Sequence, residues 1–148
     1  MQKVNIQAME IKDVPEVAAL EKLYFTSPWS EKALTDTLEN PLSYFLCAKN
    51  DNKLIGYAGM YSVNSEGYIC NILVDKDFRS KKIGTSLLNE LLNYSKSKAL
   101  KFLSLEVRKS NDQAIKFYKN IGFEVQGTRK NFYSFPQEDA IIMTHYLN

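Results

Sequence analysis

The chain alternates apolar and polar residues, or runs apolar, in seven short segments, and both patterns predict β-strands. The seven segments are residues 4–9, 43–49, 53–63, 67–74, 101–107, 123–128 and 140–147. Asn-Asp-Asn at 50–52 separates the second segment from the third and predicts a hairpin, while a turn at 64–67 leads into the fourth. A sheet is therefore the expected centre of the fold.

Helix signals stand between the first two of these strands. Asp13 as a cap and Pro15 in the first turn predict a helix that runs to Phe25. Ser30 is the candidate cap of a second, shorter helix within residues 27–38.

Two further helices follow later in the chain. The helix after Gly84 places four leucines on one face: Leu87, Leu88, Leu91 and Leu92. Residues 110–123 predict another helix with a signal at each end. Ser110 and Gln113 match a capping box at its start, and Gly122 stands where a left-handed residue ends a helix.

The order of these elements is strand, two helices, three strands, helix, strand, helix and two strands. This order predicts an α/β (α+β) fold, in which a mixed sheet carries helices on its faces. No repeat, low-complexity tract or linker interrupts residues 1–148, so we expect a single domain.

Composition excludes several classes of protein. Of the 148 residues, 45% are hydrophobic and 24% are charged, as in ordinary globular proteins, and the net charge of +2 gives no global electrostatic case for a nucleic-acid partner. The first residues lack the apolar core of a signal peptide, and no apolar run approaches the ~20 residues of a membrane span. We therefore expect a cytoplasmic protein with no membrane partner; its oligomeric state stays open.

The cysteines and the histidine give no metal or triad signal. Cys47 and Cys70 lie in apolar strand segments and are expected to be buried, reduced thiols. His145, the one histidine, lies in the last apolar strand, where a structural role is favoured over a catalytic one. A Cys/His zinc site lacks ligands, and we expect no metal.

A basic loop precedes the third helix. Arg79, Lys81 and Lys82 crowd the segment between a strand ending near Val74 and a helix beginning near Thr85. Free N–H groups and the positive end of the helix dipole would point at an anion above the loop, such as a pyrophosphate. The glycines of a Walker A or Rossmann loop are missing. Local physics leaves both an anion site and a merely solvated surface open.

The strand at 101–107 and the following helix add polar side chains. Alternation places Glu106 and Arg108 on the same strand face, where they form either a surface ion pair or part of a site. Asn111 opens the next helix. Tyr118 lies on the apolar side of that helix, and periodicity alone favours a core aromatic residue there.

These segments together resemble a known family. Residues 74–88 and 105–123 resemble the acetyl-CoA-binding core of the GCN5-related N-acetyltransferase (GNAT) superfamily, whose fold is a mostly antiparallel sheet of about six or seven strands flanked by about four helices. Arg79 to Gly84 corresponds to the signature Arg/Gln-x-x-Gly-x-Gly/Ala. Lys82 stands where the first glycine is usual, which is tolerable if its φ is negative.

Three further segments narrow the resemblance. Residues 27–34, 129–133 and 138–143 are similar to the ribosomal-protein-alanine N-acetyltransferase subfamily, which acetylates the N-terminal alanine of ribosomal protein S18. The resemblance implies acetyl-CoA as co-substrate and direct transfer of the acetyl group to an amine.

The resemblance also implies roles for individual residues. Glu106 would be the general base, directly or through a water, and Tyr118 the general acid that protonates the leaving thiolate. Acetyl-CoA would contact Ile72, Leu73, Val74, Ser80, Lys81, Lys82, Ile83, Gly84, Thr85 and Asn111. The acceptor N-terminus would lie beside Trp29, Arg129, Asn131 and Tyr133.

Other functions stay open at this point. Sister enzymes of the same superfamily acetylate lysine ε-amines, other protein N-termini or small-molecule amines. A non-catalytic acyl-CoA-binding module would need neither Glu106 nor Tyr118, and nucleic-acid binding through the loop would depend strongly on salt.

Overall fold

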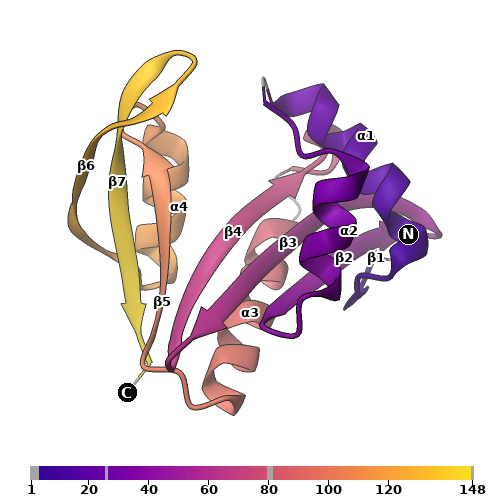
Figure 1. Cartoon of the computed structure of the whole chain (residues 1–148), viewed down its shortest axis with the longest axis horizontal. Helices are drawn as coiled ribbons and strands as arrows, with labels where there is room; N and C mark the ends of the chain where they lie inside the picture. Colours follow the sequence, from indigo (N-terminus) through magenta and orange to yellow (C-terminus); the bar gives the residue numbers. More distant parts are fainter. Residues whose placement is uncertain (1–3, 26, 80–81, 148) are drawn as a thin grey trace.

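The computed structural model describes residues 4–25, 27–79 and 82–147 and contains one seven-stranded sheet in the order β1-β2-β3-β4-β5-β7-β6 (Figure 1). The strands are β1 (Val4–Ala8), β2 (Ser43–Asn50), β3 (Lys53–Val63), β4 (Glu66–Val74), β5 (Phe102–Arg108), β6 (Glu124–Ser134) and β7 (Gln137–Tyr146). All neighbouring strands are antiparallel except β4 and β5. The predicted α/β (α+β) class and the mostly antiparallel sheet are confirmed.

Helices cover both faces of the sheet. Helices α1 (Val14–Tyr24) and α2 (Glu31–Glu39) pack on one face, and α3 (Ile83–Ser97) packs on the other (Figure 1). Helix α4 (Asp112–Ile121) lies on the same side as α3 and packs against the same apolar cluster. Two 3-10 turns, Ile11–Asp13 and Lys76–Phe78, complete the described elements.

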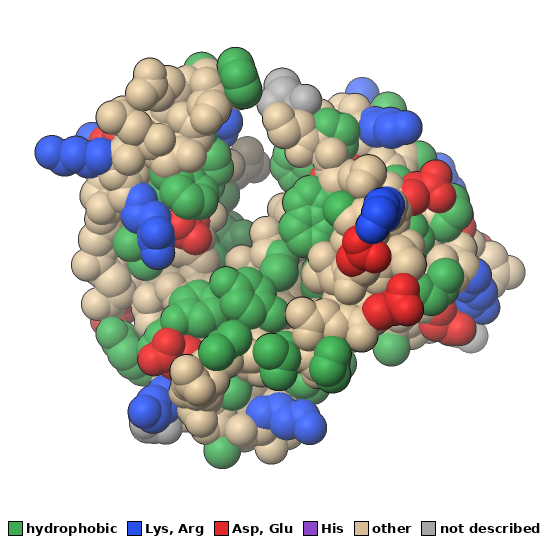
Figure 2. All heavy atoms as spheres, viewed as in Figure 1, with side chains coloured by type: hydrophobic (Ala, Val, Ile, Leu, Met, Phe, Trp, Pro, Cys, Tyr) green, Lys and Arg blue, Asp and Glu red, His purple; other side chains and the backbone are tan. Residues whose placement is uncertain are grey.

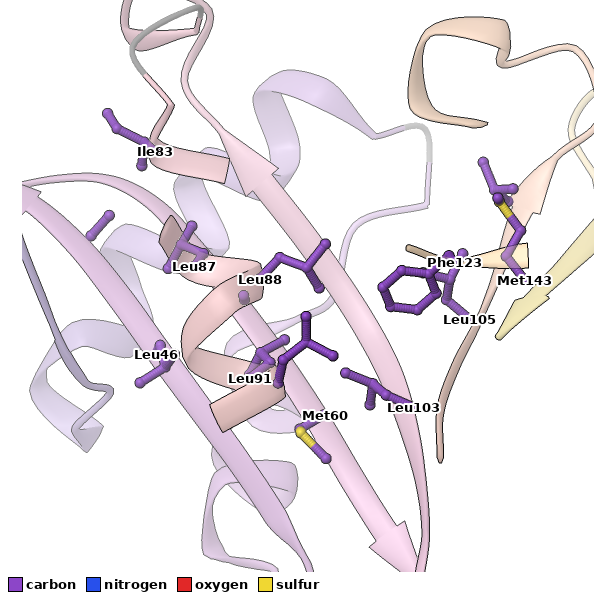
Figure 3. Packing of buried hydrophobic residues seen from close by; sticks show 14 of the residues in the cluster. Leu46, Met60, Ile83, Leu87, Leu88, Leu91, Leu103, Leu105, Phe123 and Met143 are labelled. Atoms are coloured by element: carbon purple, nitrogen blue, oxygen red, sulfur yellow. The ribbon is translucent and has the colours of Figure 1, made fainter. Parts of the chain in front are cut away.

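The larger apolar core lies between α3 and the sheet. The predicted leucine face of α3 is fully buried, and Leu87, Leu88 and Leu91 are each 0% exposed. In Figure 3, Leu91 lies beside Met60 of β3 and Leu103 of β5, which belong to the same apolar cluster as Leu87 and Leu88. Burial of each such side chain contributes about 1.5–3 kcal/mol. This core fixes the position of the loop that precedes α3.

The helix ends differ from the predictions in three details. Asp13 lies at the cap of α1, but its carboxylate instead accepts hydrogen bonds from Glu10 N (2.8 Å) and Lys49 Nζ (2.7 Å). The predicted capping box of Ser110 and Gln113 at the start of α4 was wrong, because Asn111 is the cap residue. Its Oδ1 accepts a hydrogen bond from Ala114 N at 3.1 Å. Helix α3 begins at Ile83, before the predicted start.

Other local predictions are confirmed. Gly122 ends α4 with a φ of 118°, in the left-handed region. Cys47 and Cys70 are free thiols, as expected; Cys47 is buried, whereas the expected burial of Cys70 is only partial. His145 lies in β7, its Nδ1 2.9 Å from Tyr146 O and its ring against Phe123. Within the described ranges, no helix is long and apolar enough to cross a membrane.

The last two strands are longer than predicted. Beyond residue 128, β6 continues to Ser134 as an exposed edge strand with register shifts at Val125/Gly127 and Arg129/Tyr133. Its polar, irregular sequence conceals the strand because bulges break the period-two alternation. The β6–β7 hairpin therefore extends beyond the sheet and stands beside α4 (Figure 1).

Strands β4 and β5 diverge from each other. Their parallel register covers only Glu66–Tyr68 against Phe102–Ser104, and beyond it the strands splay apart (Figure 1). Figure 2 shows a hollow at this point, between the β5–β7 part and the part that carries α1. From Ile69 to Val74, β4 has no strand partner on this edge among the described residues, so backbone groups face the hollow.

Candidate active site

Two cavities open on this splay and meet. The larger, about 810 Å³, lies between α1, β5 and the β6–β7 hairpin. The smaller, about 500 Å³, lies between the end of β4, the start of α3 and α4. Four residues line both cavities: Ile72, Asn111, Ala114 and Tyr118. The wall around Tyr118 is thus where molecules bound in the two cavities would touch.

The smaller cavity gathers the residues predicted to bind acetyl-CoA. All the described members of that set line it: Ile72, Leu73, Val74, Lys82, Ile83, Gly84, Thr85 and Asn111. Ser80 and Lys81, the remaining members, lie outside the described residues. The sequence prediction therefore brings together one continuous surface, formed by β4, the α3 N-terminus and α4.

The N-terminus of α3 has the geometry of an anion site. The first helical hydrogen bond runs from Ser86 N to Lys82 O (3.0 Å), so the N–H groups of residues 83–85 have no partner within the helix. A Cβ at Gly84 would meet Phe117 at 3.5 Å, an ordinary contact. Internal packing does not require glycine there, whereas a ligand lying close to the backbone would.

Lys82 has a left-handed backbone conformation. Its φ is 61° and its ψ 22°, so the negative φ that would make a side chain tolerable at this position is not adopted. The loop keeps the conformation that the usual glycine adopts freely, although a lysine side chain costs about 1–2 kcal/mol there. Retained strain of this kind is typical of functional sites.

Arg79 closes one side of the smaller cavity. Its Nε donates to Val74 O at 2.9 Å, and its guanidinium lies 4.8 Å from the centre of the Tyr24 ring. The Tyr24 hydroxyl in turn donates to Asp75 Oδ1 (3.2 Å) and accepts from Lys76 N (2.8 Å). The end of α1 is therefore fastened to the loop that follows β4.

The larger cavity contains both predicted catalytic residues and half of the predicted acceptor set. Glu106, Tyr118, Trp29 and Tyr133 line it, whereas Arg129 and Asn131 lie outside its wall, on β6. Arg129 nevertheless reaches the site through Glu106. The backbone N–H of Asn131 donates to Asp139 Oδ1 at 2.9 Å.

The ion pairs around Glu106 differ from the surface pair that was considered. Glu106 Oε2 lies 2.9 Å from Arg129 Nε, and Arg108 Nη1 lies 3.2 Å from Glu138 Oε1. The alternative of an ion pair between Glu106 and Arg108 is therefore wrong. The Glu106 side chain is 32% exposed, so the carboxylate is accessible from the cavity while Arg129 orients it.

Tyr118 belongs to the core and to the site at once. Its ring makes edge contacts with Phe117 and Phe123, at centroid distances of 5.2 and 5.6 Å. Burial, and then the nearby Tyr133 hydroxyl, raise the pKa of Tyr118 to about 12. The phenol therefore keeps its proton at neutral pH and can donate it into either cavity.

Arg108 holds the hairpin that walls the larger cavity, a role that the sequence did not suggest. Its guanidinium donates to the carbonyl oxygens of Pro136 (2.9 Å) and Phe135 (3.2 Å) and lies 4.3 Å from the centre of the Tyr133 ring. Glu138, its ion-pair partner, also accepts from Ser110 N at 2.6 Å. No local sequence pattern predicts these contacts, which join residues far apart in the chain.

Comparison with known proteins decides the family. Residues 14–123 match the Acetyltransferase (GNAT) family, which is more than half of the chain. The chain belongs to this family. As a GNAT enzyme it is an acetyl-CoA-dependent N-acetyltransferase.

Relatives of this GNAT enzyme span nearly its whole length. The [Ribosomal protein bS18]-alanine N-acetyltransferase of Escherichia coli (strain K12) is 33% identical over 141 residues, which cover 94% of this chain and 95% of that protein. The N-alpha-acetyltransferase RimI of Mycobacterium tuberculosis is 32% identical over 146 residues, 95% of this chain and 90% of that protein. The crystal structure of the ribosomal-protein-S18-alanine N-acetyltransferase from Escherichia coli superposes with a TM-score of 0.90 and 30% identity, covering 99% of this chain and 95% of that chain.

Proposed function

We propose that this GNAT enzyme acetylates the α-amine of an N-terminal alanine, that of ribosomal protein S18, with acetyl-CoA in the smaller cavity and the protein N-terminus in the larger. The observation that carries the proposal is the meeting of the two cavities at Tyr118. Similarity to named S18-alanine N-acetyltransferases supports the choice of substrate. A ribosomal substrate also places the reaction in the cytoplasm.

The smaller cavity has the features that acetyl-CoA requires. The β4 edge at Ile72, Leu73 and Val74 offers backbone groups that can pair with the amide-rich pantetheine arm as an added strand would. The N–H groups of residues 83–85 can bind the pyrophosphate at the α3 N-terminus. We include Ser80, Lys81 and Lys82 in this cradle on the family signature. When bound there, acetyl-CoA supplies the acetyl group on a thioester.

Glu106 is the proposed general base. At pH 7 roughly one α-amine in ten is already neutral, because the α-amine pKa is near ~8, whereas a lysine amine has a pKa near ~10.4. A carboxylate therefore has a modest task with an N-terminal amine and a much harder one with lysine. Glu106, held by Arg129 at 2.9 Å, accepts the proton directly or through a water.

Tyr118 is the proposed general acid. It lines both cavities and keeps its proton at neutral pH, since burial raises its pKa to about 12. It donates that proton to the CoA sulfur as the acetyl group leaves for the amine. Asn111 lies in the same shared wall, where we propose that it contacts the thiol end of acetyl-CoA.

The acceptor N-terminus is proposed to enter between α1 and the hairpin. Trp29 and Tyr133 line the two sides of this entrance. Arg129 and Asn131 lie on the adjoining stretch of β6, where they can contact residues that follow the acetylated alanine. GNAT enzymes that modify lysine or small amines use a related core, so the acceptor must be tested directly.

A peptide panel tests the proposed reaction. We expect acetyl transfer to a peptide that begins with alanine and none to a peptide with a blocked N-terminus and an internal lysine, with mass spectrometry locating the acetyl group. Glu106→Gln and Tyr118→Phe should each lower kcat by about 100-fold or more and leave acetyl-CoA binding unchanged. Acetylation of the blocked peptide alone would refute the α-amine proposal, and unchanged turnover in either variant would refute that residue's role.

A further inference from the structure

A second carboxylate, Glu21, faces the larger cavity. It lies near the end of α1, one to two helical turns after Val14, Val17 and Ala18, and therefore continues their apolar stripe. Glu21 is only 1% exposed and contributes to the cavity wall. A buried carboxylate is costly unless it is compensated or used.

The partners of Glu21 are all uncharged donors. Trp29 N donates to Oε1 at 3.0 Å, and Asn71 Nδ2 donates to Oε2 at 2.9 Å. The Tyr57 hydroxyl donates to the same Oε2, and Asn71 Nδ2 also lies 3.0 Å from that hydroxyl. Three donors converging on the two oxygens suit a carboxylate that carries its negative charge, because a protonated acid would have to donate from one of them.

The other charged groups of the cavity are neutralised by partners. Glu106 is paired with Arg129, and Arg108 is paired with Glu138. The net charge of each pair is zero. Among the described residues of the wall, Glu21 therefore contributes one negative charge that no described cation offsets. Beside a protein wall such a charge attracts a cation several times more strongly than it would in bulk water.

We propose that Glu21 is an acceptor-binding residue, whose negative charge recognises the ammonium form of the substrate α-amine in the larger cavity. The inference rests on the proposed α-amine substrate. Because most α-amines are protonated at pH 7, the cation is the form that first enters the site. Glu21 then acts in binding, and Glu106 accepts the proton that must leave before transfer.

Binding to enzyme saturated with CoA, which cannot transfer an acetyl group, isolates this step. Calorimetry compares a peptide that begins with alanine with the same peptide carrying a propionyl group in place of alanyl, which has the same shape but no amine. Wild-type enzyme should bind the amine peptide about tenfold or more tightly, as expected for a charge-assisted contact. Glu21→Gln should remove this preference while its affinity for the propionyl peptide stays unchanged.

Two variants separate the charge from the hydrogen bonds. Tyr57→Phe removes one donor and keeps the charge, so the preference should persist. The double variant E21Q/N71D moves the carboxylate from position 21 on α1 to position 71 on β4. The hydrogen bonds are kept, because the amide at position 21 and the Tyr57 hydroxyl can both donate to the carboxylate at position 71. Because its hydrogen bonds are kept, the double variant should fold even if E21Q alone does not. It should also keep the preference for the amine peptide over the propionyl peptide.

Several results would overturn the inference. The first is a wild type that binds the amine peptide and the propionyl peptide equally. The second is a preference for the amine peptide that survives in E21Q or is lost in the charge-keeping variants Tyr57→Phe and E21Q/N71D. The third is a preference that Glu106→Gln abolishes and E21Q does not. Failure of the proposed function is a separate outcome, since the wild type would then not acetylate the alanine peptide at all. A wild type that acetylates it but shows no preference contradicts only the role of Glu21.

Discussion

Lys82 is a strained residue in the proposed phosphate cradle, and Lys82→Gly should stabilise the fold. A non-glycine residue in the left-handed region costs about 1–2 kcal/mol, and Lys82 has a φ of 61°. Glycine gives back about 0.5–1 kcal/mol through the greater freedom of the unfolded chain. The net gain is about 0.5–1 kcal/mol, or roughly 1–4 °C in Tm for a domain of this size.

Lys82→Ala is the matched control. Alanine removes the ammonium group but keeps a Cβ in the left-handed region, so it should leave Tm close to that of the wild type. Thermal unfolding of the three proteins without ligand therefore separates strain from charge. A glycine variant no more stable than the alanine variant would refute the strain argument.

The same two variants measure what the lysine contributes to acetyl-CoA binding. If the backbone N–H groups hold the pyrophosphate, losing one exposed cation should weaken binding by no more than about fivefold in both variants. Weakening of tenfold or more, equal in both, would mean that the lysine ammonium itself holds phosphate and that the strain is kept for that contact.

Three further predictions concern Tyr118, Gly122 and Arg108. The folded-state pKa of Tyr118 is raised from 10.0 to about 12, so between these pH values the unfolded chain loses the phenol proton while the folded protein keeps it. In urea unfolding, the wild type should therefore lose about 1.4 kcal/mol of stability per pH unit relative to Tyr118→Phe over this interval. Parallel stability curves for the two proteins would contradict the raised pKa. Gly122→Ala should cost about 1–2 kcal/mol, because φ is 118° and a Cβ would lie 2.9 Å from His145 Nε2; unchanged urea unfolding would contradict this. Arg108→Lys should raise KM for the peptide about tenfold through a loosened hairpin and leave KM for acetyl-CoA unchanged, and equal changes in both would contradict it.

Much of the fold follows from local sequence signals. The strand periods, the leucine face of α3 and Gly122 each act within one element, and each was predicted correctly. The second half of β6 was not, because residues 129–134 are polar on an exposed edge and the strand is bulged. An exposed edge strand lacks the apolar alternation that would reveal it.

The site could be predicted only in part. The cofactor residues come from the loop and strand that carry the family signature, so a linear pattern was enough to find them. The partner of Glu106 depends on how β5, β7 and β6 align, since Arg108 and Arg129 both face Ala140 of β7 from opposite sides. Such a register is set by tertiary packing rather than by neighbours in sequence. Glu21 does leave a signal in the sequence, because it places a carboxylate on the apolar stripe of α1.

We propose that the joined cavities let this enzyme pass an acetyl group from acetyl-CoA to a protein α-amine. The most direct test is mass analysis of intact ribosomal protein S18, unacetylated at the start, after incubation with this enzyme and acetyl-CoA, followed by fragmentation to locate the modification. We expect the gain of a single acetyl group on the N-terminal alanine, and none with Tyr118→Phe over the same time. An unmodified protein, or an acetyl group found only on lysine side chains, would contradict it.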